Sequence, residues 1–151
     1  MIACGSARSI SGTFLTMSGY PDVTIANNTH VQSGNIMTLY GEQSPGFVYQ
    51  NNVTIRDSQG YGVKGDASGE GTIALNTFTP GATFLNNVIV GANASQYPAK
   101  NFYPASVTDV GFVDVAKGDF RLVPASRYHR PATAGGLLGV NPAELPKHAS
   151  K

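Results

Sequence analysis

The chain has 151 residues, a formal net charge of +1 at pH 7 and 13% charged residues. This length corresponds to one domain, and the charged fraction lies well below the ~25% of an average domain. A near-neutral chain lacks the basic field that attracts nucleic acid, and no apolar run approaches the ~18 residues of a membrane span, so we expect neither nucleic acid nor a membrane as a partner.

Cysteine usage and the first residues bear on the compartment. Cys4 is the only cysteine, so no disulfide can form within the chain. The charged start and the apolar core of a signal peptide are missing ahead of it. We therefore expect either a cytoplasmic protein or a chain that begins downstream of a targeting segment.

The composition favours strands and turns over helices. Leu, Lys and Glu, which fill exposed helix faces, are scarce, whereas Thr, Val, Tyr, Phe and Asn are frequent and glycine occurs 18 times. The first expected strand covers residues 12–18, with Phe14 facing inward, and Pro21 and Asp22 end it.

From Val23 onward one unit occurs three times. It reads VTIANNTHVQSG from Val23, FVYQNNVTIRDS from Phe47 and ATFLNNVIVGAN from Ala82. Each copy has a β-rich run, an Asn-Asn pair and a second β-rich run. The pairs begin at positions 27, 51 and 86, so the steps are 24 and 35 residues. The second step is longer by 11 residues, which indicates stacked repeats with one insertion.

Alignment of the copies predicts which side chains face the core. Four mostly apolar columns are expected to face inward: Val23, Phe47 and Ala82; Ile25, Tyr49 and Phe84; Thr29, Val53 and Val88; Val31, Ile55 and Val90. Two mixed columns are expected to face outward: His30, Thr54 and Ile89; Gln32, Arg56 and Gly91. The Asn pairs are expected at the bend between strands, where asparagine tolerates a left-handed backbone and stacked side chains can form a ladder.

The remaining elements are shorter. Further β-rich runs cover residues 35–40 and 61–64. Residues 72–78 are compatible with a strand or a short helical turn, inside an inserted loop near residues 65–81. Downstream, we expect a helical turn at residues 106–110 and two strands, 111–116 and 119–123, around a tight turn at Lys117 and Gly118.

The C-terminal residues form a separate region. Residues 124–151 contain four prolines and no strand pattern, so we expect an extended tail that packs along the stack or caps its end. The chain is thus divided into residues 1–123, which hold the coils and a terminal β-rich segment, and residues 124–151, the tail.

Several segments together resemble a known family. The series FVYQNNV, YGVKG, TFTPGATFLNNVIVG, YPAKNFYPASVTDVGFVD and GDFRLVPASRY is similar to the C-terminal segment of bacterial right-handed parallel β-helix proteins of the pectin-lyase-like superfamily. The resemblance covers residues 23–128 and departs from the family at residues 132–139 (ATAGGLLG), where members carry an Asp-rich run. It implies an all-β fold, a right-handed parallel β-helix or solenoid of about three to four coils with an irregular C-terminal tail.

The resemblance also implies a function. Family members are typically larger, secreted or surface-associated proteins, and many bind or act on polysaccharides. We therefore expect a carbohydrate-binding or polysaccharide-processing module, the C-terminal part of a larger secreted or cell-surface protein. If it is an enzyme, the family implies a polysaccharide lyase or a glycoside hydrolase. The alternative is a non-catalytic structural or surface-interaction solenoid.

Polysaccharide lyases that this chain resembles place a basic residue and acid-bound cations on an outward sheet face. The candidate catalytic residues are Arg56, Asp57, Lys64 and Asp66. The candidate substrate-binding residues are His30, Gln32, Arg56, Tyr61, Lys64 and Glu70. Where they are exposed, Tyr20, Tyr40, Tyr61, Tyr97 and Tyr103 could supply sugar-stacking rings, and we expect at least some of them to lie in the core instead. The competing interpretation is that these charges only keep an outward face soluble.

Three further expectations concern the tail, metals and assembly. Tyr128, His129 and Arg130 form a polar cluster that either contacts a ligand or anchors a loop. No three carboxylates share one column, so no metal or cofactor is expected, and calcium near residues 66–71 (DASGEG) is the alternative left open. A chain that starts in the middle of a solenoid presents an open β edge, so we expect a homo-oligomer formed through that end.

Overall fold

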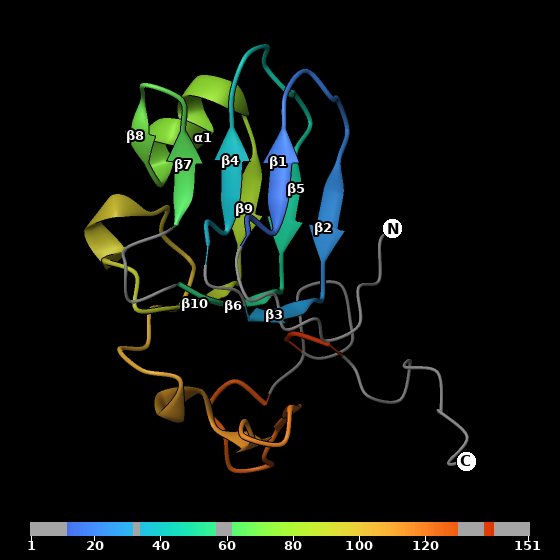
Figure 1. Ribbon diagram of the computed structural model, residues 1–151, viewed down its shortest axis with the longest axis vertical. Coiled ribbons are helices and arrows are strands. Elements are labelled where there is room, and N and C mark those ends of the chain that lie inside the picture. The colour runs from blue at the N-terminus through green and yellow to red at the C-terminus, as the bar shows by residue number, and fades with distance from the viewer. Residues whose placement is uncertain (1–11, 32–33, 57–61, 130–137, 141–151) are drawn as a thin grey trace.

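The structure, a computed structural model, describes residues 12–31, 34–56, 62–129 and 138–140. Within these ranges most regular elements are short strands, accompanied by the helix α1 (Thr72–Phe78) and the 3-10 turns η1 (Ala94–Gln96) and η2 (Thr108–Val110) (Figure 1). The expectation of a mainly β chain is therefore confirmed. None of the helices in the described ranges is long and apolar enough to cross a membrane.

Three parallel sheets form the body of the molecule. The first contains β1 (Leu15–Met17), β4 (Met37–Leu39) and β7 (Val63–Gly65); the second β2 (Thr24–Ala26), β5 (Val48–Gln50) and β9 (Thr83–Leu85); the third β3 (Thr29–Val31), β6 (Val53–Ile55) and β10 (Val88–Val90). The chain visits the three sheets in the same order three times, and we call each passage a circuit. Successive circuits pair strand on strand, as Figure 1 shows for β1, β4 and β7.

The register between circuits is the one that the sequence repeat predicts. In the second sheet Ile25 pairs with Tyr49, and Tyr49 pairs with Phe84. In the third sheet Val31 pairs with Ile55, and Ile55 pairs with Val90. The alignment of the three Asn-containing copies is therefore confirmed residue by residue.

The Asn pairs make the bend between the second and third sheets, also as expected. Asn27, Asn51 and Asn86 have φ angles of 59°, 58° and 56°. Asparagine adopts this left-handed conformation more readily than other non-glycine residues, because its short amide side chain can bond locally. The same turn therefore recurs in every circuit.

The second asparagine of each pair forms a continuous ladder along the stack. Asn28 Nδ2 donates to Asn52 Oδ1 at 3.1 Å, Asn52 Nδ2 donates to Asn87 Oδ1 at 3.1 Å, and Asn87 Nδ2 donates to Asn101 Oδ1 at 3.0 Å. The main-chain N–H of each donor residue bonds to the same oxygen, at 2.9–3.0 Å. We call these four residues the Asn ladder. It confirms the predicted ladder and adds Asn101, which lies outside the repeated pairs.

The outward assignment is wrong for one of the two columns of the third sheet, that of His30, Thr54 and Ile89. His30, Thr54 and Ile89 are all buried, and His30 Nε2 lies 2.7 Å from Tyr49 Oη, inside the circuits. In a regular strand every second side chain points to the same face, but the left-handed turn at Asn27 breaks this alternation. Ile25, Asn28 and His30 are therefore all buried, with two residues between the first pair and one between the second. The expected face of this sheet is therefore inverted.

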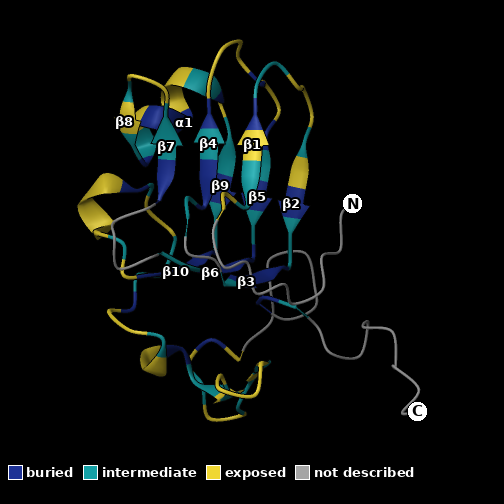
Figure 2. Ribbon diagram, in the orientation of Figure 1, coloured by how far each residue is buried: buried dark blue, intermediate teal, exposed yellow. Residues whose placement is uncertain are grey.

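The columns that were expected to face inward on this sheet lie on its other face. Val53, Val88 and Val90 form a second core with Tyr128 and other residues of the C-terminal segment: Val110 and Leu138. Both faces of the third sheet are therefore covered, and most residues of its strands are buried (Figure 2).

The main core lies inside the circuits and contains a row of stacked rings. Ring centroids are 6.3 Å apart for Phe47 and Tyr49, 5.2 Å for Tyr49 and Phe84, and 6.5 Å for Phe84 and Tyr97. At the first circuit Phe14 stacks on His30 with centroids 3.8 Å apart, which agrees with its expected inward position. The inward position of the two columns at the second sheet is thus confirmed: Val23, Phe47 and Ala82; Ile25, Tyr49 and Phe84.

The insertion lies where the longer repeat step places it. Seventeen residues (66–82) separate β7 from β9, whereas eight (40–47) separate β4 from β5. They form β8 (Gly69–Glu70), antiparallel to β7, and then α1, so the helical alternative for residues 72–78 is the correct one. In Figure 1 β8 and α1 lie at the end of the first sheet, beside β7.

The C-terminal part also follows the expectation in outline. The strands β11 (Phe112–Asp114) and β12 (Asp119–Leu122) pair antiparallel, and η2 forms the expected helical turn. In the tail, Gly139 N–H donates to Asn51 O at 2.8 Å, and Val140 N–H donates to Thr29 Oγ1 at 3.0 Å. This described part of the tail packs along the stack, while residues 130–137 and 141–151 lie outside the described residues.

Candidate functional site

Three of the candidate residues meet beside the first sheet. Arg56 follows β6, Lys64 lies in β7, and Glu70 lies in β8 directly opposite Lys64. Arg56 Nε donates to Glu70 Oε1 at 3.1 Å, and Lys64 Nζ donates to Glu70 Oε2 at 2.9 Å. The antiparallel return from β7 to β8 thus brings one carboxylate between two cations that come from neighbouring circuits.

Tyr97 is the fourth member of this group. Its hydroxyl donates to Glu70 Oε1 at 2.8 Å and accepts the main-chain N–H of Val63 at 3.2 Å. Its ring is buried next to Phe84, so Tyr97 belongs to the core and its candidate role as a sugar-stacking ring is wrong. We call Arg56, Lys64, Glu70 and Tyr97 the Glu70 cluster.

A glycine makes room for the cluster. A Cβ atom at Gly62 would overlap Tyr97 Oη and Glu70 Oε1. Gly62 is itself buried and directly precedes β7. The absence of a side chain at this position lets the hydroxyl and the carboxylate meet against the start of the strand.

The contacts fix the protonation of Glu70. Burial alone would raise the pKa of its carboxyl, but hydrogen bonds from Lys64, Arg56 and Tyr97 outweigh burial and hold the pKa below its usual value. Burial, together with the hydrogen bond to Glu70, raises the pKa of the Tyr97 hydroxyl well above its usual value. Glu70 is therefore ionised and Tyr97 neutral across the physiological range.

This arrangement is suited to binding rather than to proton transfer. Both oxygens of Glu70 already accept hydrogen bonds, and a low pKa makes a poor general base near pH 7. The side chains of Lys64 and Arg56 keep 39% and 19% of their surface exposed, against 9% for Glu70. Two cations face one carboxylate, so the exposed side of the cluster carries a surplus positive charge.

The other candidates do not join the cluster. Asp66 is exposed in the turn between β7 and β8, and its carboxylate has no hydrogen bond or ion pair within the described residues. His30 is 6% exposed and bonded to Tyr49 in the core, so its expected place on an outward surface is wrong. Three further candidates, Gln32, Asp57 and Tyr61, lie outside the described residues.

The remaining tyrosines divide into two groups. Tyr20 and Tyr40 are exposed by 67% and 44%, as expected for rings available to a ligand. Tyr103 is half-buried and its hydroxyl donates to Pro98 O at 2.6 Å, so its polar end is already engaged.

The metal expectation concerns the loop around residues 66–71. Within the described ranges no three His, Cys, Asp or Glu side chains group together. Glu70, one of the two acids in this loop, is directed to Lys64 and Arg56 instead of toward Asp66. The two cations beside it oppose the binding of a third.

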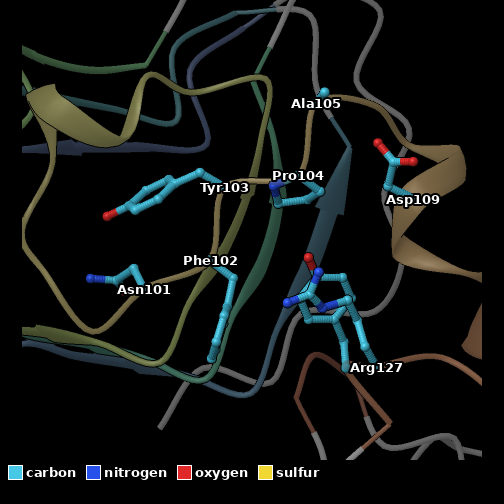
Figure 3. A pocket seen from close by; sticks show the side chains of 8 residues that line it. Asn101, Phe102, Tyr103, Pro104, Ala105, Asp109 and Arg127 are labelled. Carbon is cyan, nitrogen blue, oxygen red and sulfur yellow. The ribbon is translucent and has the colours of Figure 1, made fainter.

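A pocket that the sequence did not predict lies next to the C-terminal segment (Figure 3). It has a volume of about 560 Å³ and is lined by residues 101–105 together with Asp109, Arg127 and Tyr128. Two sequence signals lie near it: Tyr103, one of the candidate sugar-stacking rings, and the polar cluster at residues 128–130, of which Tyr128 is buried and His129 is exposed. The guanidinium carbon of Arg127 lies 5.5 Å from the centre of the Tyr128 ring.

Comparisons with protein-family models, with curated proteins and with solved structures find nothing that matches this chain.

Proposed function

We propose that the chain is a segment of a right-handed parallel β-helix of the pectin-lyase-like kind and that it binds carbohydrate. Three observations support the architecture: the circuits pair in register, the Asn ladder runs through all of them, and the core lies between the three sheets. A secreted or cell-surface parent protein agrees with this proposal.

The Glu70 cluster is the observation that carries the binding proposal. Lys64 continues the outward column of the first sheet, in register with Thr38 and Thr16. This column offers hydroxyl and ammonium groups spaced by about 4.8 Å, the distance between neighbouring strands. Hydroxyl and ammonium groups bind sugar hydroxyls and carboxylates, and the surplus positive charge of the cluster favours an acidic polysaccharide.

The test is binding of the full chain to a set of neutral and acidic polysaccharides, measured by affinity electrophoresis and calorimetry. Lys64→Met keeps the apolar stem but removes the charge, so we expect the dissociation constant to rise by roughly three- to tenfold. Lys117→Met is the matched control, because Lys117 is exposed and paired only locally with Asp114. Equal effects of the two substitutions, or the lack of any retarded polysaccharide, would contradict the proposal.

A polysaccharide-processing version is checked in the same assay. Unsaturated products that absorb in the ultraviolet would indicate lyase chemistry, and new reducing ends would indicate hydrolysis. Activity that is lost in Asp66→Asn would assign the exposed carboxylate of this turn as the base.

A non-catalytic structural module is the second candidate, and the closed contacts of Glu70 favour it. The carboxylate ties β8, and with it the insertion, to Arg56 and Lys64. If these ion pairs are purely structural, Glu70→Gln changes the stability of the chain, and no polysaccharide binds to the unmodified chain.

We also propose self-association through the first circuit. Its three strands β1, β2 and β3 are the outer strands of their sheets within the described residues. Unpaired strand edges readily pair with another chain. Light scattering over a tenfold dilution series should show a mass that falls with dilution, and a constant monomer mass would contradict self-association.

A further inference from the structure

A fourth strand-like segment continues the third sheet beyond β10. Phe102 N–H donates to Asn87 O, Ile89 N–H donates to Phe102 O, and Gly91 N–H donates to Pro104 O, each at 2.8 Å. Phe102 also forms a parallel bridge with Val88. Residues 101–105 are thus the last row of this sheet.

The outer side of this row is unpaired in the described part of the chain. In an extended segment the N–H and C=O of one residue point to the same side, and those of the next residue point to the opposite side. Because Phe102 faces β10, the groups of Asn101, Tyr103 and Ala105 face away from it, and none of these N–H or C=O groups bonds to a described residue. We call residues 101–105 the terminal edge.

Proline does not close this edge. Pro104 lacks an N–H, but its carbonyl accepts from Gly91 and therefore lies on the side that faces β10. An N–H at position 104 would have pointed toward β10. The N–H groups of Tyr103 and Ala105, which point away from β10, are therefore unaffected by the proline.

The pocket near the C-terminal segment lies along this edge. Side chains of consecutive residues point to opposite faces of a sheet, yet all five residues of the terminal edge line the same pocket. A pocket that runs along the edge of a segment contacts consecutive residues in this way. Its volume of about 560 Å³ lies within the ~300–1,000 Å³ of ligand-binding pockets.

The far wall of the pocket carries charge. Arg127 is exposed, rests against the ring of Tyr128, and has no ion pair among the described residues. Ser126 holds this turn, because its hydroxyl donates to Val110 O at 2.6 Å and accepts from Tyr128 N–H at 3.1 Å. Asp109 Oδ2 accepts from Ser106 N–H and Oγ, both at 2.9 Å. Figure 3 shows Arg127 and Asp109 on the side of the pocket opposite Asn101 and Tyr103.

We propose that the terminal edge binds an extended peptide segment by strand addition, with an acidic side chain of that peptide against Arg127. The main-chain groups of Asn101, Tyr103 and Ala105 supply alternating donors and acceptors, which match a peptide backbone. Arg127 supplies a guanidinium that pairs with a carboxylate on the outward side of the added strand. This activity is independent of the proposed carbohydrate site, which lies on the first sheet.

The surroundings favour one strand over a second copy of the chain. End-to-end stacking of two copies would require all three sheets to be open at this end, but β8 and α1 occupy the end of the first sheet. The pocket is also bounded by Asp109 and Arg127 on the side opposite Asn101 and Tyr103.

The test is a titration of the isotope-labelled full chain with a blocked seven-residue peptide of alternating threonine and valine and one central glutamate. We expect the amide signals of Asn101, Tyr103 and Ala105 to shift and to gain protection from hydrogen exchange. The same peptide with a central lysine should bind more weakly, by on the order of tenfold, because it loses the charged pair with Arg127.

Two pairs of variants complete the test. Ala105→Pro removes one outer donor and should weaken binding about fivefold, whereas Ala105→Ser keeps the donor and should leave the affinity unchanged. Arg127→Met keeps the stem over Tyr128 and should abolish the preference for glutamate, whereas Arg127→Lys should retain most of it.

Four outcomes would overturn the proposal. The first is that the amide signals of the terminal edge do not shift with saturating peptide, and the second is that the glutamate and lysine peptides bind equally well. The third is that an acidic oligosaccharide, but not the peptide, shifts these amide signals. The fourth is that their protection from hydrogen exchange rises with protein concentration without any ligand. The third would assign the pocket to sugar, and the last would assign it to a second copy of the chain.

Discussion

Among the polar networks that join the circuits, the Asn ladder and the Glu70 cluster differ in almost every physical respect. The Asn ladder is neutral, largely buried and repeated from Asn28 to Asn101. The Glu70 cluster is charged, partly exposed and present once, where β8 returns to β7. The two central ladder residues, Asn52 and Asn87, each bond to the circuit before them and to the asparagine that follows them in the stack, whereas the cluster bonds around one carboxylate.

The difference indicates which network specifies the stack and which is local. A buried amide that loses its partner leaves unsatisfied groups in the core, so the ladder constrains every circuit. A half-exposed ion pair contributes little because water and salt screen it. We therefore expect substitutions in the ladder to destabilise the whole fold, and substitutions in the cluster to act on the insertion and on binding.

The largest expected effect comes from breaking the ladder at its centre. Asn52→Ala removes the acceptor of Asn28 and the donor to Asn87 in a fully buried position, and should lower the free energy of unfolding by roughly 2–4 kcal/mol. Urea unfolding followed by circular dichroism measures it. Asn93→Ala, at the exposed N-cap of η1, is the control and should cost about 1 kcal/mol or less. Equal costs would show that the ladder has no special role.

A second buried network tests whether repetition matters. The Tyr49 hydroxyl lies 2.7 Å from His30 Nε2 and 2.7 Å from Thr54 Oγ1, and no equivalent exists at Phe84 one circuit later. Tyr49→Phe should cost about 1–2 kcal/mol, because His30 and Thr54 remain bonded to each other at 2.9 Å. Urea unfolding measures this loss of unfolding free energy as well. A loss as large as that of Asn52→Ala would contradict the expectation that the repeated ladder matters more than this single network.

The left-handed turn can be separated from the ladder at Asn27, whose φ is 59°. Asn27→Ala places an unsuited residue in this conformation and should cost about 1 kcal/mol, whereas Asn27→Gly should be nearly neutral. Thermal unfolding of the two variants in parallel measures the difference. If alanine and glycine behave alike, the side chain of Asn27 rather than its backbone conformation determines the turn.

The smallest effect is expected in the cluster and depends on pH. The folded-state pKa of Glu70 is lowered, so its contribution to stability is present above the unfolded value of about 4.5 and is lost as the pH falls through the folded value. Glu70→Gln should therefore cost about 1 kcal/mol at pH 7 and progressively less below about pH 4. The unfolding free energies of the unmodified protein and of Glu70→Gln, measured across this range, test the prediction. A difference between the two that grows at low pH would contradict a lowered pKa of Glu70.

Much of the fold was predictable because the repeat is a local property. The Asn pairs, their left-handed turns, the register of the second and third sheets and the β11–β12 hairpin all follow from residues that are close in the sequence or repeat within it. The face of the third sheet was not predictable from alternation alone. The turn at Asn27 changes the phase of the alternation, and the covering residues Tyr128 and Leu138 lie far along the chain.

The candidate site was predictable only in part, for a related reason. Arg56, Lys64 and Glu70 were among the charged residues expected on one outward face, and the structure brings these three together while Asp66 stays apart. Tyr97 was named only as a candidate sugar-stacking ring, because nothing near it in the sequence shows that it packs on Phe84 and bonds to Glu70. His30 was misplaced by the same error of phase that inverted its sheet.

The sequence by itself determined the repeat, the turns and the register, because each depends on the conformational preferences of a few residues and on their spacing. Only the tertiary structure decided which face of the third sheet lies inside, which carboxylate meets the two cations, and where the last row of that sheet leaves an edge open. These three features depend on contacts between segments that are distant in the chain, and such contacts leave no periodic signal in the sequence.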